Sequence, residues 1–323
     1  MDFLNKIDRS KLQRITLIVI AALTLLALVL LLVIIIASIE KGEDPSQTDG
    51  GNEQIVVNSE KIEFTELEVT EDTLLTGSLL LVNKDHYYDV PESLNLVKIY
   101  EYRESHRGNS ESTYKLPDSS QRLEATAMAY MHEMLMDLGN ETNNHNIMIA
   151  SAFRTHSDQS NYSIPAGYSD SHTGCIAALT VSGGASPYLY DESNSELDSW
   201  LRKNSYKYGY VVRYPDDKVE TTGVEDYSYA YRYVGLPHAK YIYDNALCLE
   251  EYIEYLKKNT SIKDMLKVNA TDGYEYAIYY VDCKAGDEVK VPLQTPNPDG
   301  STNFPYTVSG TNDGGVVITI KIG

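Results

Sequence analysis

The hydrophobic pattern begins with one long apolar stretch, residues 15–39, which contains no charged side chain. A membrane-spanning helix needs about 20 apolar residues, whereas the apolar part of a cleaved signal peptide is only about 7–15 residues long. Basic residues precede the stretch and acidic residues follow it soon after. By the positive-inside rule, we expect a single-pass anchor at 15–39, a cytoplasmic tail at 1–14 and an extracytoplasmic remainder.

The pattern then changes to a linker and the first globular elements. Residues 40–60 are polar, contain glycines and show no apolar period, which predicts an extracytoplasmic linker. The run Leu79–Asn83 predicts a buried strand. After the capping residues Asp118–Ser120, a helix is expected to run as far as Gly139, and Ile147–Ala150 predicts a short strand. The apolar stripe of that helix is Leu123, Ala127, Met131, Met134, Leu135 and Leu138.

Helix and strand patterns alternate further along the chain. Leu197, Trp200 and Leu201 have helical spacing, and the β-branched and aromatic run Tyr210–Tyr214 predicts a strand. Residues Leu249–Asn259 predict a helix whose basic end suits the helix dipole.

The sequence pattern changes from helical to strand-like at about residue 259. The runs Tyr274–Val281 and Val316–Ile322 are typical of strands, and prolines and glycines punctuate the space between them. This pattern predicts a small β-rich region at 259–323. It would either pack on the preceding domain or form a module of its own.

Composition and charge narrow the classes of partner. The net charge of −20 argues against nucleic acid, whose phosphates require clustered Lys and Arg. The 27 Tyr, against 4 Phe and 1 Trp, reflect either a lineage bias or an amphipathic surface for sugars or peptides. The 3 cysteines are widely spaced and predict neither a zinc ribbon nor a disulfide framework. Cys175 and Cys248 lie in apolar runs and are expected in the core.

Several short motifs recur in order between residues 79 and 258. They are LLLVNKDH (79–86), SAFRTHSDQ (151–159), GYSDSHTG (167–174), W…N…YG…RYP (200–215), TGVEDYSYAYRYVG (222–235) and LCLEEYIEYL (247–256). In order and spacing they resemble the VanY-type zinc D-Ala-D-Ala carboxypeptidases, which share a Hedgehog-like peptidase fold. The resemblance implies an α+β fold, with an antiparallel sheet flanked by helices.

The family's chemistry uses a zinc ion held by two His and one Asp, with a Glu as the base. The resemblance places the three ligand positions at Ser171, Ala178 and Ala230, and the base position at Tyr227. A catalytic zinc needs three protein ligands and an open position for water, and alanine has no donor atom. The resemblance therefore implies a degenerate member that has lost both zinc and reaction, so that no cofactor is expected.

A rewired metal site is the alternative that keeps the chain an enzyme. His172 lies one place after the lost ligand, but a shift of one residue turns a side chain to another face. No carboxylate follows before Asp191, so the Asp ligand has no local substitute. We expect His172 to be an exposed or hydrogen-bonded turn residue.

The substrate side of the family's site is better preserved. Arg154 matches an arginine that binds or polarises the peptide, and a guanidinium can grip a terminal carboxylate through two bonds. Gln159 and Ser169 match the polar wall of the pocket. Structural roles in holding the motif loops are the competing explanation for Arg154 and Gln159. Asp170 replaces the family's Glu and is expected to be solvated.

Together these patterns predict a membrane-anchored, extracytoplasmic protein of the bacterial cell wall with a carboxypeptidase-like domain at 61–258. It would be a pseudoenzyme that binds peptidoglycan stem peptides ending in D-Ala-D-Ala. The alternatives are an active carboxypeptidase with a rewired site and a scaffold that contacts another envelope protein. A hollow lined by Arg154, Gln159 and Ser169 would favour binding, whereas filling by Tyr227 and Tyr229 would favour the scaffold.

Overall fold

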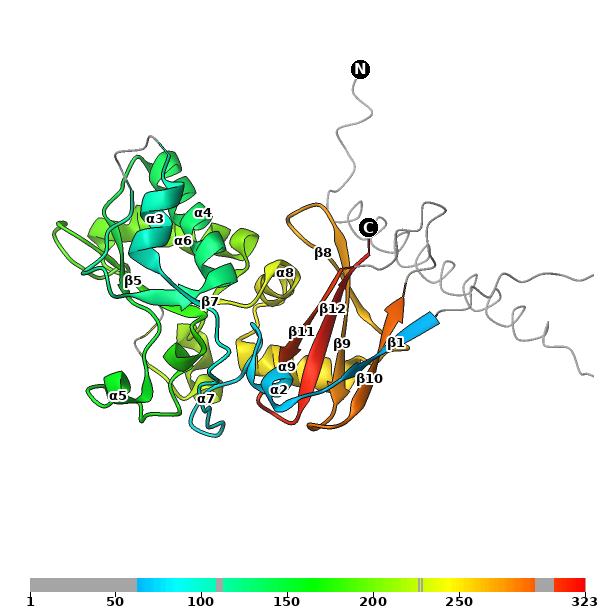
Figure 1. Ribbon diagram of the computed structural model, residues 1–323. Coiled ribbons are helices and arrows are strands. Elements are labelled where there is room, and N and C mark those ends of the chain that lie inside the picture. The colour runs from blue at the N-terminus through cyan, green and yellow to red at the C-terminus, as the bar shows by residue number, and fades with distance from the viewer. Residues whose placement is uncertain (1–62, 109–112, 226, 228, 294–304, 323) are drawn as a thin grey trace, which may run out of the picture. The chain divides into compact units, whose positions relative to one another are not determined.

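The computed structural model describes residues 63–108, 113–225, 227, 229–293 and 305–322 (Figure 1). The predicted tail (1–14), membrane span (15–39) and linker (40–60) all lie outside these residues. The predicted localisation, a single pass through the cell membrane, is corrected: within the described part of the chain, no helix is long and apolar enough to cross a bilayer.

A four-stranded antiparallel sheet carries the motifs singled out above. Its strand order is β4-β5-β7-β6, with bounds β4 Ile147–Ser151, β5 Ile176–Val181, β7 Ala230–Tyr233 and β6 Tyr210–Val212. The predicted strands at Ile147–Ala150 and Tyr210–Tyr214 are thus confirmed within a residue or two. Every side chain of β7 is buried, as expected for an inner strand.

Helix α4 (Ala125–Thr142) packs the predicted apolar stripe into the core of this sheet, except for Leu123, which belongs to β3 and is buried from there. The start of the helix differs from the prediction: Glu124, not Asp118–Ser120, caps it, because its carboxylate accepts the backbone N–H groups of Thr126 and Ala127. The helix also runs past Gly139 and ends at Asn143, which adopts a left-handed conformation. Nearby elements are β2 (Leu96–Lys98), α3 (Ile99–His106), β3 (Arg122–Glu124) and α6 (Ser195–Asn204).

Short helical elements link the strands of this sheet. They are α5 (His156–Gln159), η1 (Asp170–Thr173), η2 (Glu192–Asn194), η3 (Ser205–Tyr208), η4 (Asp216–Lys218) and α7 (Val219–Thr222). Two longer helices, α8 (Leu236–Asp244) and α9 (Leu249–Asn259), follow β7. The helices predicted at Leu197–Leu201 and at Leu249–Asn259 are present.

A second four-stranded antiparallel sheet occupies the C-terminal part, in the order β11-β12-β9-β8. Its strands are β8 (Leu266–Asn269), β9 (Glu275–Asp282), β11 (Tyr306–Gly310) and β12 (Gly315–Lys321). Beside it, β1 (Glu63–Glu68) pairs with β10 (Glu288–Leu293), and α2 (Glu71–Leu75) follows β1. Strands were therefore predicted correctly in this region, and one of its ladders uses residues from the start of the described chain.

A hydrophobic cluster that is separate from the core of the first sheet reaches both sheets, through Val211 of β6 and Val317 of β12. The same cluster contains Leu79 and Leu81, residues of α8 and α9, and Ile278 from the second sheet. The prediction of a strand at Leu79–Asn83 is wrong in one respect: the segment is buried and joins no sheet. Its backbone instead forms isolated hydrogen bonds outside any strand ladder. The N–H of Leu79 donates to Ser309 Oγ, and the N–H of Leu81 donates to the Thr311 carbonyl.

The architecture is a mixed helix-and-sheet fold built on antiparallel sheets. The predicted fold class is confirmed at this level. Figure 1 shows helices α3, α4 and α6 beside strands β5 and β7, with α9 close to β9 and β12. On the inner strand β5, Ala178 pairs with Ser151 of β4 and with Ala230 of β7, and Ser171 of η1 accepts a backbone hydrogen bond from the loop after β4.

Candidate functional site

The fold brings the three predicted ligand positions together. Ala178 on β5 and Ala230 on β7 are direct partners in the sheet. Ser171 lies in η1, which leads into β5, and its carbonyl accepts the backbone N–H of Arg154 just beyond β4. All three positions are buried. The side chains at these three predicted positions are a hydroxyl and two methyl groups.

Zinc does not fit this donor set. A water-activating zinc site takes three protein ligands from His, Cys, Asp or Glu, and Ser171, Ala178 and Ala230 supply none of these. Throughout the described residues, no group of three or more such side chains is placed to hold a metal ion. We derive no reaction step through zinc for this chain.

Tyr227, which the resemblance puts at the base position, is packed among apolar and aromatic neighbours. It stacks on Tyr214 with ring centroids 5.5 Å apart and meets Tyr229 edge to face at 4.8 Å. It also packs in a cluster with Ile176 and Ala230. Burial raises the pKa of the Tyr227 phenol. The positive charge of Arg154 and its hydrogen bond to the phenol lower this pKa, but they offset the effect of burial only in part. A phenol that stays protonated cannot replace a carboxylate as a general base.

Arg154 lies against Ser171, one of the predicted ligand positions. Its Nη2 donates to Ser171 Oγ over 2.7 Å, and the ring of Tyr162 covers its guanidinium with 3.8 Å between Cζ and the ring centroid. The side chain is buried at 8% exposure. Its Nε has no hydrogen-bond partner among the described residues. An unpaired buried donor is costly, so this atom marks a place where a ligand acceptor would be stabilised.

Gln159 and Ser169 are more deeply placed than predicted. Gln159, at 1% exposure, ends α5; its Nε2 donates to the Ile164 carbonyl over 2.7 Å, and its Oε1 has no partner in the described structure. Ser169 is also 1% exposed and precedes η1, where its carbonyl accepts the His172 N–H. Both residues hold motif loops.

A polar pocket of about 610 Å³ opens beside Arg154. Its lining residues are Ser120, Gln121, Arg122, Ala150, Ser151, Phe153, Arg154, Asp158, Asn161 and Tyr162. Of the three predicted binding residues, only Arg154 lines this pocket. Arg122 and Tyr162 could not be found from the sequence, because neither belongs to a motif and the pocket forms only when β3 and the loop after α5 come together.

His172 was predicted to be either an exposed or a hydrogen-bonded turn residue. It is buried and hydrogen-bonded. Its Nδ1 donates to the Arg154 carbonyl over 2.7 Å, and its Nε2 accepts the Gly167 N–H over 3.0 Å. Burial lowers the pKa of His172, which agrees with a neutral ring that donates at one nitrogen and accepts at the other. The residue fixes the backbone of Arg154.

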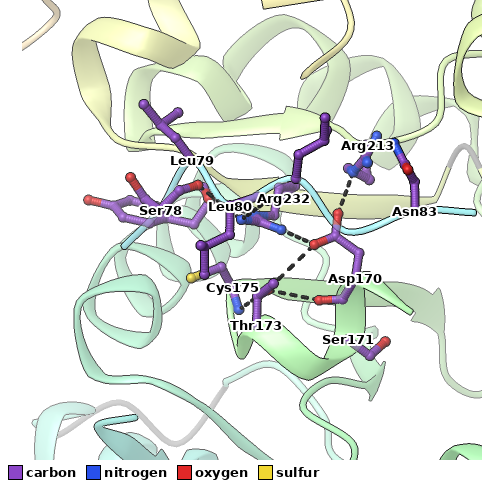
Figure 2. A network of polar contacts seen from close by, with 12 residues as sticks. Ser78, Leu79, Leu80, Asn83, Asp170, Ser171, Thr173, Cys175, Arg213 and Arg232 are labelled. Carbon is purple, nitrogen blue, oxygen red and sulfur yellow. Dashed lines mark hydrogen bonds and ion pairs between the residues drawn. The ribbon is translucent and has the colours of Figure 1, made fainter. Parts of the chain in front are cut away.

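Asp170 corrects the expectation of a solvated carboxylate. It is 1% exposed and accepts from the guanidinium groups of Arg213 and Arg232, both fully buried (Figure 2). Glu250 takes a further bidentate contact from Arg213, at 2.9 and 2.8 Å. Burial by itself would raise the pKa of Glu250, but Arg213 holds that pKa below its usual value. The acidic position of the motif thus ties η1 to β6, β7 and α9.

Comparison with known proteins agrees with this geometry. The family model described as VanY, D-alanyl-D-alanine carboxypeptidase, matches residues 159–236. A D-alanyl-D-alanine carboxypeptidase of Enterococcus faecium is 31% identical over 265 residues, which are 79% of this chain and 78% of the relative. A second, from Enterococcus faecalis strain V583, is 49% identical over 61 residues, 19% of this chain and 23% of that protein.

A solved structure of a related peptidase has the same fold as this chain. The vancomycin-resistance D,D-dipeptidase VanXYg, in complex with a D-Ala-D-Ala phosphinate analogue, superposes with a TM-score of 0.62 at 23% identity. The match covers 81% of this chain and 99% of that one. With the extended match to the Enterococcus faecium enzyme, it confirms the resemblance first seen in the motifs: the chain belongs to the VanY family of D-alanyl-D-alanine carboxypeptidases.

Proposed function

We propose that this chain is a catalytically inactive member of its family that binds peptidoglycan stem peptides ending in D-Ala-D-Ala. The observation that carries the proposal is the side chains at the former ligand positions. Ala178 and Ala230 are partners on the two inner strands and Ser171 is buried in η1, which leads into β5, yet these three side chains cannot hold a zinc ion. The position that the resemblance gives to the carboxylate base is occupied by Tyr227, a half-buried phenol whose pKa is raised by burial.

Binding is supported by the state of Arg154. Its guanidinium is held on one side by Ser171 and covered by Tyr162, so its direction is fixed before any ligand arrives. Arg154 is one of the residues that line the polar pocket in which a peptide end can lie, and its buried Nε has no partner among the described residues. Preorganised guanidinium donors are well suited to a terminal carboxylate, the group that a D-Ala-D-Ala end presents.

The packing of Tyr227 and Tyr229 favours the scaffold alternative at the catalytic position itself. The ring of Tyr227 stacks on Tyr214 and meets the ring of Tyr229 edge to face, so neighbouring aromatic side chains fill the space around it. The Arg154 pocket lies beside them and stays open. We therefore assign binding to the pocket and leave the former catalytic position without a role.

The test is calorimetry of the full chain with acetyl-Lys-D-Ala-D-Ala and with the same peptide amidated at its C-terminus. We expect the free acid to bind at least about tenfold more tightly, because a charge-assisted bond contributes about 1.5–3 kcal/mol. In Arg154→Gln this preference should disappear. Thermal unfolding of the variant controls for its contact with Ser171.

A parallel assay measures D-alanine released from the same peptide, with and without added zinc. We expect no release in either case. Release that depends on zinc would overturn the claim of inactivity and favour a rewired site. Absence of binding by either peptide would overturn the binding half of the proposal and leave the scaffold.

A further inference from the structure

Two arginines from different parts of the fold face the same pocket. Arg122 belongs to β3, and Arg154 lies just beyond β4; the N–H of Phe153 donates to the Arg122 carbonyl and holds the two segments side by side. Both side chains line the pocket of about 610 Å³. Arg122 corresponds to no motif of the family resemblance.

Both guanidinium groups keep donors unused. Arg154 Nε is buried and unpartnered. For Arg122, the contact found within the described residues is the face of the Phe153 ring, 5.1 Å from its Cζ to the centroid, and no hydrogen bond or ion pair of its guanidinium is found there. A guanidinium stacked on a ring keeps its N–H edges available for an oxyanion.

The carboxylate of the pocket wall is already in use. Asp158 accepts from the backbone N–H of Thr155 at 3.1 Å and from its hydroxyl at 2.7 Å, in a capping box of α5. These hydrogen bonds lower the pKa of Asp158, with smaller contributions from Arg122 and Arg154. Two arginines against one engaged carboxylate leave a local positive balance on a chain whose net charge is −20.

We propose that Arg122 forms a second carboxylate subsite in this pocket. The ligand is a peptide with two carboxylates: its C-terminal carboxylate bonds Arg154, and an acidic side group upstream bonds Arg122. This inference rests on the proposed function, because it assigns a further contact to the same bound peptide. It makes the pocket selective for stem peptides with a free acidic side group over those in which that group is amidated.

The experiment is a double-mutant cycle on the full chain. Acetyl-Glu-Lys-D-Ala-D-Ala and its Gln counterpart are titrated into the wild type, Arg122→Gln and Lys263→Gln. We expect the wild type to prefer the Glu peptide by about tenfold, the factor that about 1.4 kcal/mol gives, and Arg122→Gln to bind both peptides equally. Lys263 is exposed and outside the pocket lining, so its variant controls for the same loss of net charge and should keep the preference.

The possible outcomes distinguish a failure of the Arg122 subsite from a failure of the proposed stem-peptide binding. If both peptides bind through Arg154 but Arg122→Gln keeps the full preference for Glu, the subsite is overturned and the proposed function stands. An equal loss of preference in Lys263→Gln would show a long-range charge effect, which also overturns the subsite. If neither peptide binds the wild type, both proposals fall together.

Discussion

Single residues decide how the acidic loop of the site is held. Asp170 is one carboxylate between two buried guanidinium groups, and the bidentate pair of Arg213 with Glu250 balances the second positive charge. Buried charges are tolerated only when paired and hydrogen-bonded. Asp170, which the sequence pattern predicts to be a solvated turn residue, is therefore a buried ion-pair partner that links η1 to two arginines (Figure 2).

Asp170→Asn should destabilise the protein strongly. The amide keeps the shape but leaves Arg232 without its counter-charge, and breaking a buried pair costs about 3–5 kcal/mol. Urea unfolding followed by circular dichroism measures the loss. Asp264→Asn, at an exposed position, should change the free energy of unfolding by less than about 0.5 kcal/mol. Equal effects of the two substitutions would contradict the role given to Asp170.

At the scale of elements, His238 joins three of them. It lies in α8, its Nδ1 is 2.7 Å from the Tyr252 hydroxyl of α9, and its Nε2 is 3.0 Å from the Thr319 hydroxyl of β12. The ring is almost completely buried, and burial lowers the pKa of His238 to about 3. Helices that follow the first sheet are thus bonded to the second through a neutral imidazole.

This burial predicts a pH dependence of stability. In the unfolded chain a histidine takes up a proton below about pH 6.5, whereas folded His238 stays neutral to about pH 3. The unfolded state then binds more protons, so the stabilising contribution is complete above about pH 6.5 and is lost as the pH falls toward 3. Its slope is at most about 1.4 kcal/mol per pH unit.

Urea unfolding of the wild type and of His238→Gln between pH 3 and 7 measures this contribution. The glutamine can still bond Tyr252 and Thr319 but does not titrate. We expect its free energy of unfolding to fall less steeply with acid than that of the wild type. Parallel curves would mean that His238 does not carry the effect.

For the whole described part, one hydrophobic cluster links the two sheets, because it contains Val211 of β6 as well as residues of β9 and β12. Leu79 and Leu81 from the early segment pack with Ile278 and Val317 of the second sheet. The ladder between β1 and β10 adds a second connection between the start and the end of the described chain. We expect the two sheets to unfold in one cooperative transition, because removing either would expose a face of the shared cluster.

A destabilising substitution in the second sheet should therefore shift the unfolding transition of the first sheet as well. Ile278→Ala should lower the free energy of unfolding by about 2–5 kcal/mol, and Ile278→Val by only about 0.5–1.5 kcal/mol. The 1 Trp of the chain, Trp200 on α6, reports the other end through its fluorescence. A shift in circular dichroism without the same shift in Trp200 fluorescence would show two independent units.

Much of the fold was predictable because local patterns determine it. The apolar stripe of α4, the strand runs at 147–150 and 316–322 and the helix at 249–259 need only their own side chains to specify period and burial. Leu79–Asn83 shows where this fails. Its composition predicts burial correctly, but whether a buried segment joins a sheet depends on whether a free strand edge lies beside it, and here Ser309 and Thr311 take its donors.

By itself, the sequence determined the family, the antiparallel helix-and-sheet fold and the residues at Ser171, Ala178, Ala230 and Tyr227, because motif order and side-chain chemistry are properties of the chain. Only the tertiary structure decided that Asp170 is buried between arginines, that Gln159 and Ser169 lie inside the loops, and that Arg122 shares a pocket with Arg154. These facts depend on residues far apart in sequence, and which charges meet and which donors stay free is fixed only when the segments pack.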